Sequence, residues 1–188
     1  MRKSVIIDQK CLAGSLIPSV LEIYNRENSG YLIGSNGRNR NVRVLSAYPI
    51  QTDLKKFTTV EHGNYSAMER LHKVIGIMNV KLLGGFHTHP GGPNRLSRSD
   101  VHFINEKVEE HQLDEWLEII LNVKKRAYET RHRPGWSLFP FKKKIGVKII
   151  TDPYTCYDIV MSGFWLRKNR EKLKISQEAK LWTTLKPS

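Results

Sequence analysis

Cysteine is scarce in this sequence of 188 residues, acidic residues are fewer than basic ones, and long apolar runs are missing. The two cysteines, Cys11 and Cys156, are too few and too isolated for a disulfide framework or a thiolate zinc site. No run approaches the roughly 20 apolar residues that a membrane helix needs, so no membrane partner is expected. Polar residues interrupt the first apolar run too early for a signal peptide. These absences predict a cytoplasmic protein.

Basic residues outnumber acidic ones by 31 to 18, which gives a formal net charge of +13. They gather in clusters at residues 124–126, 131–133, 142–144 and 167–174. Such a surface attracts an acidic protein or nucleic acid, but an ordinary solvated face has the same composition. The aromatic residues near these clusters are too scattered to form a platform on which bases stack. Nucleic acid is therefore a possible partner that the sequence does not favour.

The chain has the length and composition of one globular domain, with 39% hydrophobic and 26% charged residues. No internal repeat, low-complexity segment or linker divides it, so we expect a single domain over residues 1–188. From about residue 154 onward we expect a basic helical end with a loosely docked tail. Apolar periodicity predicts helices at about residues 15–26, 65–78 and 98–110, and strands at residues 5–7, 31–33, 42–48, 81–89, 116–123, 136–141 and 146–150.

The most informative segment is a predicted strand that ends in two histidines, followed by a stiff loop and a helix start. Successive side chains of a strand alternate faces, so His87 and His89 point the same way, about 7 Å apart along the backbone. Their imidazoles can converge on one ion, and Asp100, eleven positions after His89, can supply a third ligand. Three protein ligands leave a tetrahedral ion one position for water, as in catalytic zinc sites. The spacing therefore predicts a metallohydrolase.

Each half of this motif also has an ordinary structural explanation. A single histidine is more often a core or surface residue than a metal ligand. Ser97 and Asp100, ahead of an apolar-periodic run, form a capping box in which Ser97 caps the helix. Capping does not exclude ligation, because it would fix the helix start that carries Asp100. His102 is not a candidate ligand, because on a helix it would point about 200° away from Asp100.

The run His87-Thr88-His89-Pro90, followed by six residues, Ser97, two more residues and Asp100, resembles the signature of the JAB1/MPN/Mov34 (JAMM) metalloproteases. The family also carries an upstream glutamate three residues before a glycine, then an aliphatic segment and another glycine. The segment from Glu27 to Gly34 is similar to this pattern, as is the order of predicted elements from about residue 4 to residue 152. The resemblance implies an α/β (mixed α+β) fold of the cytidine-deaminase-like kind, a curved mixed sheet flanked by helices.

The resemblance also implies the roles of five residues. His87, His89 and Asp100 would bind one Zn²⁺ per chain. The bound water would have its pKa lowered towards about 7, which makes hydroxide available at neutral pH. Glu27 would accept the proton of this water and return it to the departing amine, as general base and then general acid. Ser97 would donate a hydrogen bond to the developing oxyanion.

The small single-domain form resembles the bacterial stand-alone members of the family. It implies a zinc metallopeptidase that cleaves after the C-terminus of a ubiquitin-like protein, in an antiphage defence or ubiquitin-like conjugation system. The substrate would be the ubiquitin-like protein or its conjugate, and the conjugation machinery is a possible partner. Residues 50–63 and 125–136 lie where the family carries variable insertions that shape substrate choice.

Two other functions stay open. The RadC DNA-repair-associated proteins share the His-x-His-Pro and Ser-x-x-Asp core, and the basic charge favours them. The missing helix-hairpin-helix domain and the Glu27 motif disfavour them. A non-catalytic MPN scaffold would only bind partners, but such proteins usually lack a metal residue, and all five positions are present here. Glu27 could also be an ordinary helix-end acid, with Glu22 as a nearby alternative, although the spacing to Gly30 favours Glu27.

Overall fold

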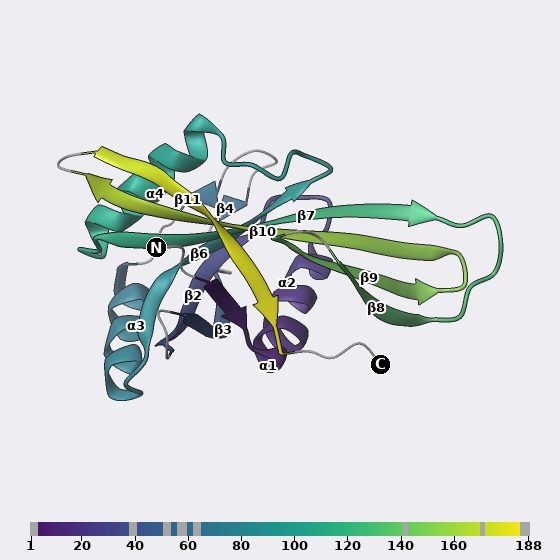
Figure 1. Ribbon diagram of the computed structural model, residues 1–188, viewed down its shortest axis with the longest axis horizontal. Coiled ribbons are helices and arrows are strands. Elements are labelled where there is room, and N and C mark those ends of the chain that lie inside the picture. The colour runs from purple at the N-terminus through teal and green to yellow at the C-terminus, as the bar shows by residue number, and fades with distance from the viewer. Residues whose placement is uncertain are drawn as a thin grey trace.

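Most of the described chain is β-strand (Figure 1). The computed structural model describes residues 4–37, 41–50, 54–55, 60–61, 65–140, 143–169 and 172–184. The strands are β1 (Ser4–Ile7), β2 (Ser29–Asn36), β3 (Val42–Pro49), β4 (Leu54–Lys55), β5 (Val60–Glu61), β6 (Lys81–Pro90), β7 (Glu115–Ala127), β8 (Gly135–Pro140), β9 (Ile145–Asp152), β10 (Thr155–Asn169) and β11 (Lys172–Thr183). The helices are α1 (Gln9–Cys11), the π-helical η1 (Leu12–Leu16), α2 (Ile17–Glu22), α3 (Tyr65–Ile77) and α4 (Arg98–Glu110).

Seven of the described strands close into a barrel in the order β11–β1–β3–β2–β6–β7–β10, with β10 pairing back onto β11. β1 is parallel to both β11 and β3, and β6 is parallel to β7, whereas the other pairs of the ring are antiparallel. β9 and β8 continue the sheet beyond β10, and with the outer parts of β7 and β10 they extend as an arm (Figure 1). The basic residues 124–126 and 131–133 lie on this arm.

The expected fold, a curved mixed sheet flanked by helices, is wrong. The sheet closes on itself, and the described helical segments, residues 9–22, 65–77 and 98–110, are short beside it. The helical end expected from about residue 154 is also wrong, because β10 and β11 occupy residues 155–169 and 172–183. These two long strands complete the ring, so the wrong C-terminal prediction is also the reason for the wrong fold class.

Side chains of the C-terminal segment explain why it is strand. In β10, Cys156, Ile159 and Met161 are fully buried and belong to a segment rich in β-branched and aromatic residues. In β11, Ala179 and Leu181 are buried while Lys180 between them is exposed, which is the period of two that a strand requires. Tertiary pairing with β7 and β1 gives these side chains a core to enter.

Two apolar clusters cover the two faces of the sheet near the site. β7 supplies Leu117, Ile119 and Leu121 to the larger cluster, which also contains the buried side chains of residues 9–22. It supplies Trp116 to the second cluster, which lies under α4 and contains Ile104. Fully burying a side chain of this size stabilises a fold by about 1.5–3 kcal/mol. Both faces of β7 are therefore buried, which fixes its register against β6.

The N-terminal helix begins earlier than the predicted residues 15–26. The Asp8 side chain accepts a hydrogen bond from the Lys10 N–H at 3.0 Å, so the helical segment starts at Gln9 and ends at Glu22. Pro18 then lies inside it, as the second residue of α2, which follows the π-helical turn of η1. The predictions for residues 65–78 and 98–110 are confirmed, because α3 spans Tyr65–Ile77 and α4 spans Arg98–Glu110.

No helix in the described ranges is long and apolar enough to cross a membrane. Of the expected insertion at residues 50–63, the structure describes Ile50 and the two short strands β4 and β5, and the remaining residues lie outside the described ranges.

Candidate metal centre

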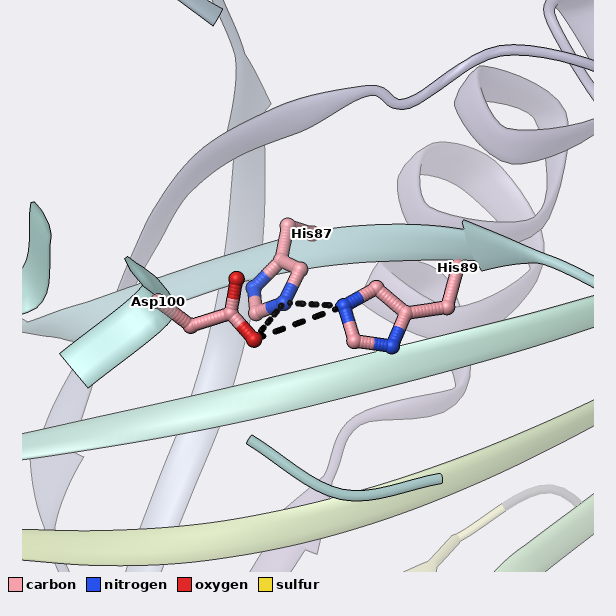
Figure 2. A group of neighbouring side chains, drawn as sticks. All are labelled: His87, His89 and Asp100. Atoms are coloured by element: carbon pink, nitrogen blue, oxygen red, sulfur yellow. Dashed lines mark hydrogen bonds and ion pairs between the residues drawn. The ribbon is translucent and has the colours of Figure 1, made fainter. Parts of the chain in front are cut away.

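The candidate centre lies where β6, the following loop and the first turn of α4 meet. β6 carries His87 and His89 on one face, as its period of two requires, and α4 carries Asp100. Figure 2 shows the three side chains pointing toward one another, and their ligand atoms lie within 4.8 Å of one another. The structure therefore brings together the three residues that the sequence spacing selected.

The distances between the three ligand atoms fit a small tetrahedral ion. The Nε2 atoms of His87 and His89 are 2.9 Å apart, and Asp100 Oδ2 lies 3.7 Å from the first and 3.6 Å from the second. Corners of a tetrahedron with bonds of 2.0–2.1 Å are about 3.3–3.4 Å apart. The three distances lie on both sides of this value, so small side-chain shifts would accommodate the ion.

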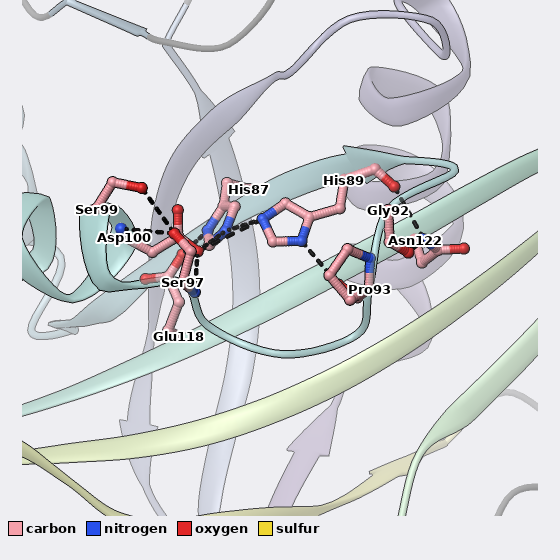
Figure 3. A network of polar contacts seen from close by, with 9 residues as sticks. All are labelled: His87, His89, Gly92, Pro93, Ser97, Ser99, Asp100, Glu118 and Asn122. Atoms are coloured by element: carbon pink, nitrogen blue, oxygen red, sulfur yellow. Dashed lines mark hydrogen bonds and ion pairs between the residues drawn. The ribbon is translucent and has the colours of Figure 1, made fainter.

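Hydrogen bonds on the outer side of each ring direct a lone pair toward the centre. His89 Nδ1 lies 2.8 Å from the carbonyl oxygen of Pro93, which can only accept, so this nitrogen carries the proton. His87 Nδ1 lies 2.6 Å from Glu118 Oε1 (Figure 3). A neutral imidazole protonated at Nδ1 has a free lone pair at Nε2. Both Nε2 atoms are therefore prepared to bind a cation.

The electrostatics of the centre favour bound positive charge. Burial raises the pKa of Asp100, but the close contacts with His87 and His89 outweigh it and hold the pKa well below its usual range. Burial lowers the pKa of His87, but the contact with Asp100 and the hydrogen bond with Glu118 outweigh it and raise the pKa to about 10. The contact with Asp100 likewise raises the pKa of His89 against the effect of burial. The lone pairs of the two histidine Nε2 atoms and of Asp100 Oδ2 face one another, which is unfavourable. A proton or a metal cation between these atoms relieves the repulsion.

Glu118 is a residue of the centre that the sequence did not reveal. It is 3% exposed on β7, and its second oxygen accepts a hydrogen bond from the indole N–H of Trp116 at 2.5 Å. Parallel pairing of β6 with β7 sets Glu118 opposite Gly85, where a Cβ atom would lie 3.1 Å from Glu118 Oε2. The one available signal was a carboxylate inside the apolar run of residues 116–121, since a buried charge needs a partner.

Glu27 lies in the turn between α2 and β2 and lines the same cavity as His87 and Asp100. Burial raises the pKa of Glu27, the two histidines lower it, and Asp100 raises it. The Glu27 carboxyl group thus responds to all three members of the candidate centre. Glu22, the alternative carboxylate, is exposed at the end of α2.

Thr88 holds the Glu27 segment against β6. Because it lies between the two histidines, its side chain points to the other face of the strand, where it is 1% exposed. Its hydroxyl accepts a hydrogen bond from the Asn28 N–H at 2.7 Å and donates one to the Arg26 carbonyl at 3.2 Å. The Thr88 N–H also donates to the Asn28 carbonyl at 2.8 Å. Residues on both sides of Glu27 are therefore bound to Thr88.

We expect Thr88→Val to lower the free energy of unfolding by about 1–3 kcal/mol, because the buried Asn28 N–H loses its acceptor. Urea unfolding followed by circular dichroism measures this change. Thr130→Val, at an exposed position, is the matched control and should leave the stability unchanged. Equal stability of the two variants would contradict a role for Thr88 in holding this segment.

Ser97 caps α4 as predicted. Its hydroxyl accepts a hydrogen bond from the Asp100 N–H at 3.1 Å, and Asp100 Oδ2 accepts one from the Ser97 N–H at 2.6 Å. Ser99 Oγ lies 2.7 Å from Ser97 Oγ. On the other side of the loop, the Asn122 side-chain amide donates to the carbonyl oxygens of His89, at 3.0 Å, and Gly92 (Figure 3). The loop that joins the two halves of the centre is thus fixed at both ends.

The family of prokaryotic homologs of the JAB domain matches residues 10–134, which is more than half of the chain. This chain belongs to that family. The resemblance noted from the His87 to Asp100 motif is thereby confirmed at the level of the family. The match ends before β8, so the C-terminal strands of this JAB-domain chain lie beyond it.

A solved structure supports the fold of the whole JAB-domain chain. The solution structure of protein DSY2949 from Desulfitobacterium hafniense is similar, with a TM-score of 0.55 over 97% of this chain and 94% of that chain. The two sequences are 16% identical, so the likeness concerns the fold alone. No curated protein shows significant similarity to the sequence.

The other histidines that the structure describes are not part of the converging group in this JAB-domain chain. The side chain of His102 is 80% exposed and lies 3.7 Å from Glu106 on α4. His72 Nε2 lies 2.8 Å from His111 Nδ1, and His111 Nε2 lies 3.1 Å from the Tyr31 hydroxyl, a chain of contacts that the sequence did not predict. His62 falls outside the described residues.

The half-buried His111 should make folding sensitive to acid. Burial lowers its pKa from 6.5 to about 4, so the unfolded chain takes up this proton first as the pH falls. Its contribution to stability is present above pH 6.5 and is lost between pH 6.5 and pH 4. Urea unfolding of the metal-free protein measures the free energy of unfolding at each pH. We expect this free energy to fall less steeply over this range in His111→Gln than in the parent. His102→Gln should keep the slope of the parent, and equal slopes in all three proteins would contradict the prediction.

Proposed function

We propose that this JAB-domain protein is a zinc-dependent peptidase or isopeptidase that cleaves after the C-terminus of a ubiquitin-like protein. The convergence of two imidazole lone pairs and one carboxylate oxygen, at distances suited to a tetrahedral ion, is the observation that carries the proposal. Two imidazoles and a carboxylate suit Zn²⁺ and leave a position for water.

A zinc ion held by His87, His89 and Asp100 would lower the pKa of bound water towards about 7 and polarise the scissile carbonyl. Glu27, whose pKa is raised by burial, would accept the proton of the attacking water and deliver it to the leaving amine. Ser97 Oγ accepts from the Asp100 N–H and lies 2.7 Å from Ser99 Oγ. With Ser99 as the donor of this hydroxyl pair, the Ser97 O–H would donate to the oxyanion.

Glu118 and the Pro93 carbonyl would act as the outer partners that orient the two histidines. Such partners fix the tautomer and the direction of each ring. The Trp116 indole holds the second oxygen of Glu118, so this carboxylate has little freedom to turn away from His87.

The expected substrate class rests on membership of the family and on the motif. We propose a ubiquitin-like protein or its conjugate as the substrate, and a conjugation or antiphage defence system as the setting. The basic arm at residues 124–126 and 131–133 offers positive charge to an acidic substrate or to a component of the conjugation machinery.

The test uses the purified, zinc-loaded protein with ubiquitin-like proteins fused to a reporter through a linear amide or joined to it through a lysine side chain. Mass spectrometry locates the new C-terminus. We expect cleavage that a chelator abolishes and that added zinc restores. A protein that binds one zinc ion but cleaves none of these substrates would overturn the peptidase proposal and favour a binding role.

We expect Glu118→Gln to lower the affinity for zinc by about 10–100-fold, because the amide orients His87 less strongly than the carboxylate. Competition with a chromophoric chelator measures the affinity. The matched control is Glu115→Gln on the same strand, since the Glu115 carboxylate binds Arg167 instead. Unchanged zinc affinity in Glu118→Gln would show that this carboxylate does not support the ligand.

A further inference from the structure

The strand β8 forms one end of the nine-stranded sheet, and in the described part of the chain it pairs with β9 alone (Figure 1). Each strand of the closed ring has at least two partners. On the side away from β9, the backbone N–H and C=O groups of residues 135–138 therefore face no other described strand. Neighbouring strands lie about 4.8 Å apart, so four steps of pairing place β8 about 19 Å along the sheet from β6. This edge is separate from the candidate metal centre.

The sequence of β8 lacks the features that usually protect an open edge, which are charged side chains and proline. The arm has a second open stretch, residues 124–127 of β7, which extends beyond the end of β6 and has β10 as its strand partner. That stretch carries the charged run Lys124, Lys125 and Arg126. Residues 135–139 contain no charged residue and no proline. The edge of β8 is therefore open to pairing with a further strand.

One face of β8 offers apolar surface next to this edge. Trp136 is 40% exposed, and Leu138, two residues later on the same face, is half-buried. Ile149 of β9 lies opposite Trp136 and is half-buried as well. An added strand would place every second side chain beside Trp136 and Leu138. Apolar residues at alternate positions of the added strand suit this face.

Positive charge flanks the edge at both ends. From Arg131 to Lys144 the chain has five basic residues and no acidic one. Arg131 and Arg133, which precede β8, are exposed. At the other end Lys143 binds Glu178 at 3.0 Å, and Lys144 is half-buried. The stronger free charge therefore lies at the start of β8.

This charge distribution disfavours a second copy of the chain as the occupant of the edge. Antiparallel pairing of two copies through β8 would place residues 131–133 of one copy beside the lysines 142–144 of the other. The like charges would repel each other at both ends of the pair. Acidic residues at the ends of an added strand would instead be attracted.

We propose that the edge of β8 binds an extended segment of a partner protein, which adds a strand to the sheet. The segment has apolar residues at alternate positions in its centre and acidic residues at its ends. Backbone hydrogen bonds supply the affinity, and the alternating side chains and terminal charges supply the specificity. Nucleic acid suits the edge less well, because its backbone cannot continue the ladder of N–H and C=O groups. Binding here needs neither zinc nor cleavage, so the inference goes beyond the proposed peptidase function.

The probe is a fluorescently labelled nine-residue peptide in which valine and threonine alternate, with two glutamates at each end. Fluorescence anisotropy measures its binding to the full-length protein, and we expect the same affinity in the zinc-loaded and the metal-free forms. A peptide with lysine in place of each glutamate should bind about 10-fold more weakly, because its ends repel Arg131 and Arg133. No binding of the glutamate peptide, or equal binding of the two peptides, would overturn the proposal.

Methylated backbone nitrogens test whether the peptide binds as a strand. Alternate N–H groups of a strand point to opposite sides, so only one set can pair with β8. We expect methylation of one alternating set to abolish binding and methylation of the other to leave it nearly unchanged. Full binding by both methylated peptides would overturn strand addition.

Substitutions of exposed residues locate the site on the protein. We expect Trp136→Ala and Arg133→Gln each to weaken binding of the glutamate peptide by about 5–10-fold. Trp182→Ala on β11 and Arg70→Gln on α3, both at exposed positions, are the matched controls and should bind like the parent. Unchanged affinity in Trp136→Ala would overturn the assignment to β8.

Two further measurements distinguish the other occupants. Light scattering is expected to show a monomer, and a dimer that Trp136→Ala separates would assign the edge to a second copy and overturn the proposal. A DNA duplex in excess is expected to leave the peptide bound at physiological salt. Displacement of the peptide by the duplex would assign the basic end of the edge to nucleic acid and overturn the proposal.

Discussion

Replacement of Asp100 by alanine is expected to reduce the zinc content of the purified protein from about one ion per chain to nearly none. The Asp100 carboxylate is the one anionic group among the three converging side chains, and its Oδ2 faces both histidine Nε2 atoms at 3.6–3.7 Å. Without it, two neutral imidazoles remain, and they form too small a donor set to retain zinc through purification. Mass spectrometry for metals, after dialysis against a weak chelator, measures the content.

The controls separate ligation from capping. Asp100 Oδ2 also accepts a hydrogen bond from the Ser97 N–H, so its loss is expected to destabilise the start of α4 by about 0.5–2 kcal/mol. Asp100→Asn keeps an acceptor for this cap and removes the charge, and it should fold like the parent while binding zinc weakly. His102→Ala, on the same helix, should keep one zinc ion. Full zinc occupancy in Asp100→Ala would contradict the proposed centre.

The second large effect is expected for Glu27→Gln, which should reduce kcat by about 10²–10⁴-fold while the zinc content stays the same. Glutamine has the shape of glutamate but cannot take a proton from water and return it to the leaving amine. Burial beside the centre already raises the pKa of Glu27, which suits a group that must be protonated in one half of the reaction. Steady-state kinetics on a cleaved conjugate measure the effect.

Glu22→Gln is the matched control, because Glu22 is an exposed carboxylate five residues earlier in the chain. It should keep the activity of the parent. A Glu27→Gln protein that cleaves at the rate of the parent would exclude Glu27 as the general base. If both variants lose activity and also lose zinc, the cause would be disturbed folding of the segment rather than lost proton transfer.

Much of the candidate site could be predicted from the sequence, because its parts are local. The alternation of a strand places His87 and His89 on one face, and a capping box places Asp100 at the start of α4. Glu118 could not be predicted in the same way, because it reaches His87 through the parallel pairing of two strands that α4 separates in the chain. The bonds from Thr88 to the Glu27 segment depend equally on residues distant in the sequence.

The sequence by itself determined the family, the converging ligand set and most elements up to about residue 152, since these depend on spacing and on local periodicity. The closed barrel was decided by tertiary structure. β1 pairs with β11, at Ser4 and Lys180, and β10 pairs with β11, so closure joins the two ends of the chain. The alternation of buried and exposed side chains within residues 155–183 leads to strands only when β7 and β1 supply backbone hydrogen-bond partners. In an open sheet, the two edge strands would have unpaired backbone N–H and C=O groups. Closure of the ring gives these groups hydrogen-bond partners.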